Sequence, residues 1–370
     1  MLFGAKKNFG FGLMRLPLVE GTDEIDFEQV NKMVDTFMES GFNYFDSARV
    51  YHAGRSEVAV RKCLAERYPR ESYVYTNKLS TECFTNEEEI DPLFEDQLKV
   101  CGMEYFDCYL LHCQTATSYA KYKKVHAYEH VQKFKEQGRI KHIGISFHDK
   151  AELLDTILSE HPEIEVVQLQ INYLDWESAS VESRKCYEVC VKYNKPVIVM
   201  EPVKGGSLAN VPADAGKLFS ELSDATPASY AIRFAAGHEN VVMTLSGMSN
   251  YDQLLDNIAT MKDYKPLDEK ELDTVWKVRD IILSLNAIPC TACRYCVEGC
   301  PMGIRIPDLF NCYNQHVAYN SGNQSFWYGI ITSTSGKASD CVKCGACEAS
   351  CPQHLPIRKL LEDVAERFGK

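Results

Sequence analysis

The sequence has no long apolar run, no excess of positive charge and no low-complexity stretch, and each absence excludes a class of protein. No apolar segment approaches the roughly 18 residues that a membrane-spanning helix needs. The first 17 residues lack the basic-then-apolar layout of a secretory signal peptide. Lys and Arg number 40 against 52 Asp and Glu, a net charge of −12, so nucleic acid and anionic membranes would repel the chain. We therefore expect neither a membrane nor a nucleic-acid partner.

What is present is the composition of an ordinary globular protein. The chain has 370 residues, of which 45% are hydrophobic and 25% charged, and this length favours about two domains. Seven short apolar segments without strict alternation are typical of strands that are buried on both faces of a parallel sheet. These segments are 42–45, 73–76, 106–111, 142–145, 166–171, 197–200 and 241–245. Amphipathic segments separate or precede them, and we expect helices over 28–39, 56–67, 87–100, 119–137, 150–159, 181–193 and 227–236.

Alternating strands and helices with short connections predict an α/β fold with right-handed crossovers. If segment 8–13 supplies a first strand, about eight units fill roughly 260 residues, which favours a closed (β/α)8 TIM barrel. A doubly wound open sheet is the alternative, but no Gly-x-Gly-x-x-Gly follows a strand. The alternation stops after Pro266. We therefore expect a barrel over 1–265, a helical linker over 266–285, and a second domain over 286–370.

Cysteine is abundant, and disulfide pairing is not expected in a chain without a signal peptide. Of 16 cysteines, eight are scattered, and we expect them mostly in the core because free cysteine packs as a small hydrophobe. The scattered ones are Cys63, Cys83, Cys101, Cys108, Cys113, Cys186, Cys190 and Cys312. The other eight form two identical runs, Cys-x2-Cys-x2-Cys-x3-Cys-Pro.

The two cysteine runs predict two [4Fe-4S] clusters. Two-residue spacings let successive thiolates converge on one cube, and in the bacterial arrangement the fourth cysteine of each run ligates the other cluster. The first cluster is therefore assigned to Cys290, Cys293, Cys296 and Cys351, and the second to Cys341, Cys344, Cys347 and Cys300. Zinc is the alternative, although zinc sites seldom use a third cysteine at this spacing and a fourth before proline. The segment resembles a small, mostly helical bacterial-type ferredoxin domain, with an insertion over 302–340 in which we expect a helix over 306–318.

Ionisable residues follow three of the predicted strands. Asp46 and Tyr51 come after the first of these strands, Lys78 after the second and His112 after the third. Chemistry in a (β/α)8 barrel gathers at the carboxyl ends of its strands, so these four side chains are expected over one mouth. Each residue alone also fits a purely structural role. Asp46 could cap a helix or turn, Tyr51 could be a loop aromatic, Lys78 a solvated strand end and His112 a core histidine.

The order of these four residues resembles the catalytic tetrad of the aldo-keto reductases. The motifs are Phe-Asp-Ser-Ala-Arg-Val-Tyr around Asp46 and Tyr51, Thr-Asn-Lys ending at Lys78, and Leu-Leu-His ending at His112. With the cysteine-rich tail, the whole chain resembles the iron–sulfur branch of that family. The residue types suit carbonyl reduction, because an alkoxide forming from a carbonyl needs a proton donor. Tyr51 would donate it, an adjacent Lys78 would lower its pKa, Asp46 would hold Lys78, and His112 would orient the carbonyl.

The resemblance also implies a bound nicotinamide dinucleotide, NAD or NADP. Ser146 and Gln170 match residues that hold the carboxamide, and the Glu201–Leu208 loop matches the one that covers the pyrophosphate. The matching nucleotide-site positions are Ser146, Gln170, Glu201, Lys204, Gly205, Gly247, Met248, Ser249, Gln253 and Asn257. A cap of the helix that follows is the bland alternative for Ser249 or Asn250. Phe147 replaces a common asparagine, and Gly247 and Gln253 replace basic residues that grip the 2′-phosphate of NADP in many members.

The leading hypothesis is an oxidoreductase in which carbonyl/alcohol chemistry at the barrel mouth is joined to electron transfer through two clusters. A nicotinamide passes two electrons together and each cluster passes one, so a flavin, a substrate radical or an external partner is required between them. Ferredoxin or another electron-transfer protein is a candidate partner. The alternatives are a ferredoxin-dependent reductase without nicotinamide, a redox-responsive regulatory protein, and clusters that only brace the tail. Exposed Fe4S4 clusters favour the reducing cytoplasm of an anaerobic prokaryote.

Overall fold

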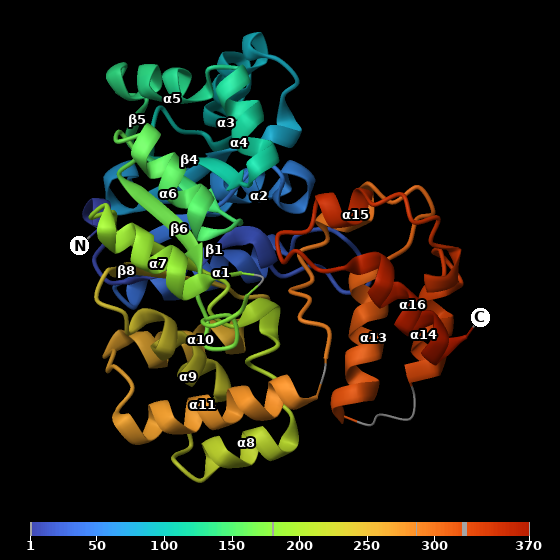
Figure 1. The fold of residues 1–370 in the computed structure, drawn as a ribbon. Helices are drawn as coiled ribbons and strands as arrows, with labels where there is room; N and C mark the ends of the chain where they lie inside the picture. The colour runs from blue at the N-terminus through green and yellow to red at the C-terminus, as the bar shows by residue number, and fades with distance from the viewer. Residues whose placement is uncertain (1, 180, 286, 320–323, 370) are drawn as a thin grey trace. The chain divides into compact units, whose positions relative to one another are not determined.

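Eight parallel strands form a closed barrel in the order β1-β2-β3-β4-β5-β6-β7-β8 (Figure 1). The computed structural model describes residues 2–179, 181–285, 287–319 and 324–369. The strands are β1 Phe9–Gly12, β2 Tyr44–Asp46, β3 Val74–Leu79, β4 Phe106–Gln114, β5 Ile140–Phe147, β6 Val166–Gln170, β7 Val197–Met200 and β8 Val241–Gly247. The seven expected strands and the first strand near residue 8 are confirmed, and the open-sheet alternative is wrong because β1 pairs with both β2 and β8.

Most of the expected helices begin and end close to the expected positions, but the α-helix expected over 56–67 ends at Val60 and a π-helical turn over Arg61–Ala65 follows it. The helices that alternate with the strands are α1 Phe27–Glu39, α2 Arg55–Val60, α3 Ile90–Cys101, α4 Ala116–Lys124, α5 Ala127–Glu136, α6 Ala151–Glu160, α7 Ser183–Lys192, α8 Ala213–Ser220, α9 Pro227–Ala236 and α10 Tyr251–Lys262. Helix α10 begins as expected from its cap, because the side chain of Asn250 accepts a hydrogen bond from the backbone nitrogen of Gln253 at 2.9 Å. Helix α8 was not predicted.

One expected helix is wrong in its continuity. Residues 119–137 form two helices, α4 and α5, since His126 adopts a left-handed φ of 48° between them. No glycine or proline marks this break in the sequence. His126 pairs with Glu87 and His130 with Asp91, at 2.9 and 2.6 Å, so contacts with the preceding helical segment accompany the change of direction.

Small residues let the barrel strands approach one another. A Cβ on Gly144 in β5 would lie 2.6 Å from side-chain carbons of Leu110 and Val166 and 2.7 Å from the Val166 carbonyl oxygen. Inward side chains such as Leu110, Val166 and Ile198 fill the interior, so the barrel is a packed core. Six of the eight scattered cysteines are buried, which confirms the expectation for those six: Cys63, Cys101, Cys108, Cys186, Cys190 and Cys312.

We predict that Gly144→Ala destabilises the barrel by about 1–3 kcal/mol, because the added methyl group overpacks the space between β4 and β6. Thermal unfolding followed by circular dichroism should show a fall of several degrees. Gly216→Ala in α8 is the matched control, since its Cβ meets only a Val211 methyl carbon at 3.7 Å and alanine favours a helix. Equal melting temperatures for Gly144→Ala and wild type would contradict the packing argument.

The chain divides into two compact units, and the barrel strands all lie in the first. The first unit comprises Met1–Glu177, Glu182–Pro202 and Ile232–Pro266, and the second comprises Ser178–Val181, Val203–Ala231 and Leu267–Lys370. The expected boundary at 286 lies outside the described residues. The second unit therefore includes the Val203–Ala231 segment that follows β7, as well as the cysteine-rich region.

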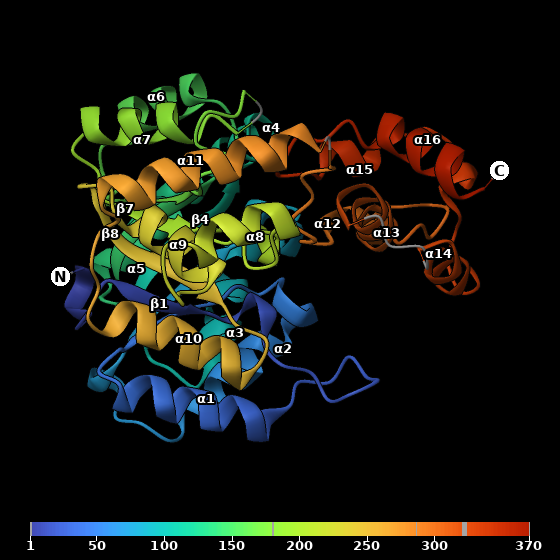
Figure 2. The same cartoon turned by 90° about the horizontal axis from the view of Figure 1, so that it is seen from below.

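The second unit is helical. Its helices include α8 and α11 (Glu269–Ser284), which pack against each other, and α12 Tyr295–Glu298, α13 Ile306–Tyr319, α14 Gln324–Thr332, α15 Ala346–Ala349 and α16 Ile357–Phe368. The expected helix over 306–318 is α13, which packs against α14 and α16 (Figure 2). Leu309, Phe310, Ile357, Leu361 and Val364 form the centre of its apolar core. Among the helices of both units that the structure describes, none is both long and apolar enough to cross a bilayer.

Candidate active site and cluster-binding segment

The four ionisable residues expected at the barrel mouth come together in the first unit. Asp46 is the last residue of β2, Lys78 lies near the end of β3, and His112 lies near the end of β4. Tyr51 begins the short 3-10 helix η3 (Tyr51–Gly54) that follows β2. Since the strands are parallel, their carboxyl ends meet at one end of the barrel, and this juxtaposition follows from the register of β2, β3 and β4.

Lys78 and Asp46 form a buried ion pair. The Lys78 Nζ donates to Asp46 Oδ1 at 2.5 Å and to the Ser47 carbonyl oxygen at 2.7 Å, and the Lys78 residue is 0% exposed. Burial lowers the pKa of Lys78 and raises that of Asp46, while their mutual attraction opposes both shifts. Gln168 Nε2 donates to the second carboxylate oxygen at 3.1 Å. The pair is held in place by hydrogen bonds on both partners.

Tyr51 lies against this pair and beside His112. Lys78 Nζ is 5.0 Å from the centre of the Tyr51 ring, and the Tyr51 and His112 rings meet edge-on with centres 5.9 Å apart. Burial, with Asp46 as the largest nearby negative charge, raises the pKa of Tyr51 well above its usual value of about 10, and Arg15 opposes this. The lowering expected from Lys78 is therefore not what the structure shows. Lys78 is committed to Asp46, and Tyr51 stays protonated as a hydrogen-bond donor.

His112 is a neutral imidazole. Burial, together with the positive charges of Lys78 and His148, lowers its pKa well below 6.5. Its Nδ1 lies 2.6 Å from the Ser80 hydroxyl, so a donor at Ser80 leaves the ring proton on Nε2. The Tyr122 hydroxyl donates to the His112 carbonyl oxygen at 2.9 Å and restrains the strand end. A neutral histidine can donate one hydrogen bond to a carbonyl oxygen without carrying charge into the site.

Three residues that support the tetrad were missed in the sequence. Ser47 accepts from Lys78 through its carbonyl oxygen, Ser80 contacts His112, and Gln168 contacts Asp46. A signal was available for one, because Gln168 precedes Gln170 by two positions and strand residues two apart share a face. Ser80 and Ser47 carry no such signal, since their partners lie about 30 residues away in the chain.

The expected carboxamide-binding residues stand at the ends of neighbouring strands. Ser146 in β5 accepts from the backbone nitrogen of Cys113 at 2.7 Å, and the Gln170 amide nitrogen in β6 donates to Asp175 at 2.7 Å. Both residues are almost fully buried. Phe147, which follows Ser146, is also buried. These contacts orient the two polar side chains at the strand ends, where the predicted carboxamide would lie.

The residues expected at the adenosine end lie where β8 leads into α10. Asn257 donates to the Ser246 hydroxyl at 2.9 Å, and Gln253 accepts from the Ser249 backbone nitrogen at 2.8 Å. Met248 is fully buried. The turn is thus braced by its own polar groups.

Arg15, which the sequence did not single out, lies beside Gly247. A Cβ on Gly247 would lie 3.2–3.3 Å from side-chain carbons of Arg15, and Arg15 pairs with Glu201 at 3.6 Å. Glu201 itself has a left-handed φ of 56° just after β7. Glycine at 247 therefore leaves room for an arginine that reaches across from the end of β1, and this arginine also bears on the pKa of Tyr51.

Two expected nucleotide residues, Lys204 and Gly205, fall in the second unit. Lys204 is 1% exposed, and its Nζ lies 3.4 Å from Gln353 Oε1. A Cβ on Gly205 would lie 2.3 Å from the Thr291 carbonyl oxygen. Their expected role at the pyrophosphate stays a prediction, and their observed neighbours belong to the cysteine-rich segment.

Four thiols assigned to the first cluster line one cavity. The cavity is lined by Cys290, Cys293, Cys296 and Cys351 together with apolar side chains such as Phe310 and Leu355. Burial and the neighbouring thiols raise the pKa of Cys296. The backbone nitrogens of residues 353, 354 and 355 hydrogen-bond to Cys351 and lower its pKa against burial, and that of Ala292 donates to Cys290 Sγ at 3.4 Å. Thiols that converge on one cavity and accept amide hydrogen bonds fit a cube of iron and sulfur.

The second set has a related arrangement. Cys347 is the second residue of the short helix α15, as Cys296 is of α12, and the two helices are in contact. Burial and Cys341 raise the pKa of Cys347 to about 11, and the backbone nitrogen of Ile304 donates to Cys300 Sγ at 3.4 Å. Across the described ranges, no three side chains of His, Cys, Asp or Glu approach as closely as the ligands of one metal ion.

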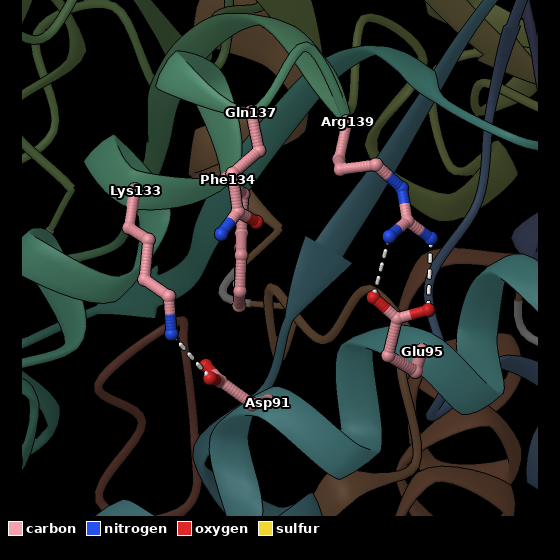
Figure 3. A pocket seen from close by; sticks show the side chains of 6 residues that line it. All are labelled: Asp91, Glu95, Lys133, Phe134, Gln137 and Arg139. Carbon is pink, nitrogen blue, oxygen red and sulfur yellow. Dashed lines mark hydrogen bonds and ion pairs between the residues drawn. The ribbon is translucent and has the colours of Figure 1, made fainter.

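A depression on the outer side of the barrel lies between α3 and α5 and has a different character (Figure 3). Lys133 pairs with Asp91 at 2.7 Å, and Arg139 makes two 2.8 Å hydrogen bonds to Glu95. Phe134 lies between these pairs. Because its charged side chains pair across the depression, we assign this feature to the packing of α3 against α5.

The protein is a (β/α)8 barrel with a Tyr–Lys–Asp–His tetrad at its mouth, and the same chain carries the two cysteine runs. Residues 8–280 match the model of the aldo/keto reductase family, and the chain belongs to this family. Residues 289–355 match a 4Fe-4S dicluster domain. The protein is therefore an oxidoreductase of the aldo/keto reductase family with a 4Fe-4S dicluster domain in the same chain.

Similar proteins agree with this assignment. A 9,11-endoperoxide prostaglandin H2 reductase of Trypanosoma cruzi is 23% identical over 63% of this chain and 77% of its own length. Aldo-keto reductase AKR11C1 of Bacillus halodurans, in its holo form, superposes with a TM-score of 0.60 at 23% identity, covering 73% of this chain and 91% of that one. A Klebsiella pneumoniae aldo-keto reductase in complex with NADPH gives 0.61 at 17% identity, covering 74% and 90%. The structural matches support the barrel fold.

Proposed function

We propose that the protein interconverts a small carbonyl compound and its alcohol at the barrel mouth with NAD(P)(H), and exchanges electrons with a one-electron carrier through its two clusters. The observation that carries the first part is the buried Lys78–Asp46 pair beneath Tyr51, with a neutral His112 at the edge of the tyrosine ring. Proton donor, cation and hydrogen-bond donor then converge at one point, as reduction of a carbonyl requires.

The residues of the chain have separate tasks in this reaction. A bound nicotinamide supplies the hydride. Tyr51, held protonated, donates its proton to the carbonyl oxygen as negative charge develops there. His112 donates a hydrogen bond that orients the same oxygen. Lys78 stabilises the tyrosinate that remains, and Asp46 keeps the ammonium in position.

The proposed dinucleotide site uses residues at the ends of β5, β6 and β8. Ser146 and Gln170 would hold the carboxamide, and Gly247, Met248, Ser249, Gln253 and Asn257 would surround the adenosine end, with Glu201 between them. The solved relative from Klebsiella pneumoniae is titled as a complex with NADPH, which supports a nicotinamide cofactor. Gly247 and Gln253 bring no charge to a 2′-phosphate, and Arg15 beside Gly247 is the basic side chain at hand. We therefore propose that NAD and NADP both bind.

The clusters serve as one-electron carriers in this proposal. Each passes one electron, whereas hydride transfer moves two. A flavin, a substrate radical or an external partner that takes two electrons together and releases them singly must therefore lie between the nicotinamide and the clusters, and ferredoxin would exchange single electrons with the clusters. The residues that support cluster binding are the eight cysteines already described, with four of them lining one cavity.

The decisive experiment uses anaerobically purified protein that contains both clusters. NADH and NADPH are titrated separately while ultraviolet–visible and EPR spectra report the clusters, and a panel of small aldehydes and ketones is tested for turnover. We expect saturable nucleotide binding and carbonyl-dependent nucleotide oxidation. If neither nucleotide binds while dithionite reduces both clusters, the nicotinamide assignment is wrong. Turnover with reduced ferredoxin alone would then favour a ferredoxin-dependent reductase. The absence of turnover with either electron donor would favour a regulatory protein.

A further inference from the structure

The loop that follows β7 holds a buried lysine in a backbone conformation that is unfavourable for it. Lys204 has a left-handed φ of 48°, and Gly205 and Gly206 continue with values of 64° and 98°. A non-glycine residue in this region costs energy and persists only where its surroundings hold it there. Lys204 is also 1% exposed, although lysine is almost never fully buried unless it is paired. The loop is therefore built to place this side chain inside the second unit.

The neighbours of this loop are the same residues that surround the first set of thiols. Lys204 Nζ lies 3.4 Å from Gln353 Oε1, and Gln353 lines the cavity together with Cys290, Cys293, Cys296 and Cys351. Thr291 also lines that cavity, and its carbonyl oxygen is the atom that a Cβ on Gly205 would meet at 2.3 Å. Only glycine permits this approach, so Gly205 lets the loop pack against Thr291. The side chain of Gln353 then lies between Lys204 and the cavity.

We propose that Lys204 is a positioning residue for the first [4Fe-4S] cluster and that its positive charge raises the reduction potential of that cluster. Reduction adds one negative charge to a cluster, and a nearby cation stabilises the reduced form more than the oxidised form. Burial strengthens the interaction because water screens it less. The proposal does not depend on which nucleotide or carbonyl compound the barrel binds.

The resemblance described above predicts a different role for Lys204. It places Lys204 in the loop that covers the pyrophosphate of the dinucleotide. The two roles make different predictions. A cation for the cluster changes the potential in the absence of any nucleotide, whereas a cation for the pyrophosphate changes only nucleotide affinity. Its present partner, Gln353, is two residues from Cys351, which favours the cluster.

The test is a potentiometric EPR titration of the nucleotide-free holoprotein carrying Lys204→Gln. We expect the midpoint of one of the two clusters to fall, with about a tenfold lower ratio of reduced to oxidised cluster at a fixed potential, or about 59 mV for a one-electron couple. Lys204→Arg should keep the wild-type midpoint. Lys343→Gln is the matched control, because Lys343 lies between Cys341 and Cys344 but is 63% exposed in its side chain and pairs with Glu362. It should move neither midpoint appreciably.

Gly205→Ala tests the seating of the loop without changing a charge. Its Cβ would force the loop away from Thr291, so we expect the same cluster to shift in the same direction as in Lys204→Gln. Iron content and the EPR line shapes establish that both clusters remain assembled in each variant. Unchanged midpoints in Lys204→Gln with both clusters intact would overturn the proposal, and a tenfold weaker nucleotide affinity in that variant would assign Lys204 to the pyrophosphate.

Discussion

Replacing Tyr51 with phenylalanine is expected to lower kcat/KM for carbonyl reduction by about 10²–10⁴-fold, because the variant loses the group that donates the proton. The ring and its contact with His112 are kept, since the two rings meet edge-on without using the hydroxyl. Nucleotide affinity should change little. Steady-state kinetics with the best aldehyde or ketone of the panel, together with nucleotide titrations, separates the loss of chemistry from a loss of binding.

Tyr119→Phe is the control for this variant. Tyr119 donates from its hydroxyl to Glu160 on the outer helices, so its removal tests whether any lost tyrosine hydroxyl depresses the rate. We expect wild-type kinetics for Tyr119→Phe. Full carbonyl reductase activity in Tyr51→Phe would remove Tyr51 from the chemistry, and a wild-type biological effect in a variant that has lost turnover would support a regulatory role.

Removing the charge of Lys78 is expected to destabilise the barrel strongly. Lys78→Met leaves the Asp46 carboxylate buried at 3% exposure without its cation, and breaking a buried ion pair in this way costs about 3–5 kcal/mol. The barrel transition in thermal unfolding should fall by roughly 10 °C. Lys78→Met/Asp46→Asn should recover much of this loss, because Gln168 can still donate to the oxygen of asparagine. Both variants should be inactive.

The pH dependence of Lys78→Met gives an independent readout. Burial already raises the pKa of Asp46 above that of an unfolded aspartate, and without Lys78 the rise is larger. The folded variant then binds a proton more readily than the unfolded chain, so its stability increases as pH falls through the raised pKa. We expect the difference in melting temperature from wild type to shrink between pH 8 and pH 5. A melting-temperature difference between Lys78→Met and wild type that does not depend on pH would contradict the role of the unpaired carboxylate. So would the absence of any difference in Lys78→Met when Asp46 is unchanged.

Much of the fold was predictable because its signals are local. The predicted strand over 197–200 coincides with β7, because a short run of β-branched residues between two amphipathic segments is typical of a buried strand in an α/β chain. The helix over 119–137 was predicted as continuous because nothing in its composition marks His126 as the break. That break coincides with the pairing of His126 and His130 with acidic residues about 39 positions earlier, which periodicity does not register.

Part of the candidate site was likewise predictable from the sequence, and part depends on tertiary contacts. Asp46, Lys78 and His112 could be singled out because the parallel topology brings the ends of successive strands together, and strand ends are visible in the sequence. The direction of the Tyr51 pKa could not, because it depends on burial and on the commitment of Lys78 to Asp46. Ser80 and Gln168 were missed as partners because their contacts form only in the folded chain: Ser80 meets His112 on the neighbouring strand, and Gln168 meets Asp46 across the barrel.

The family, the barrel, the two cysteine runs and the residue types of the tetrad could be predicted from the sequence, because all of these depend on spacing along the chain. Only the folded chain shows that burial raises the pKa of Tyr51 and lowers that of His112, which Ser80 contacts. Only the folded chain brings Lys204 to Gln353, which lines the cavity of the first set of thiols. These properties arise from desolvation and from contacts between residues up to 149 positions apart, as for Lys204 and Gln353, and only the folded chain brings such groups together.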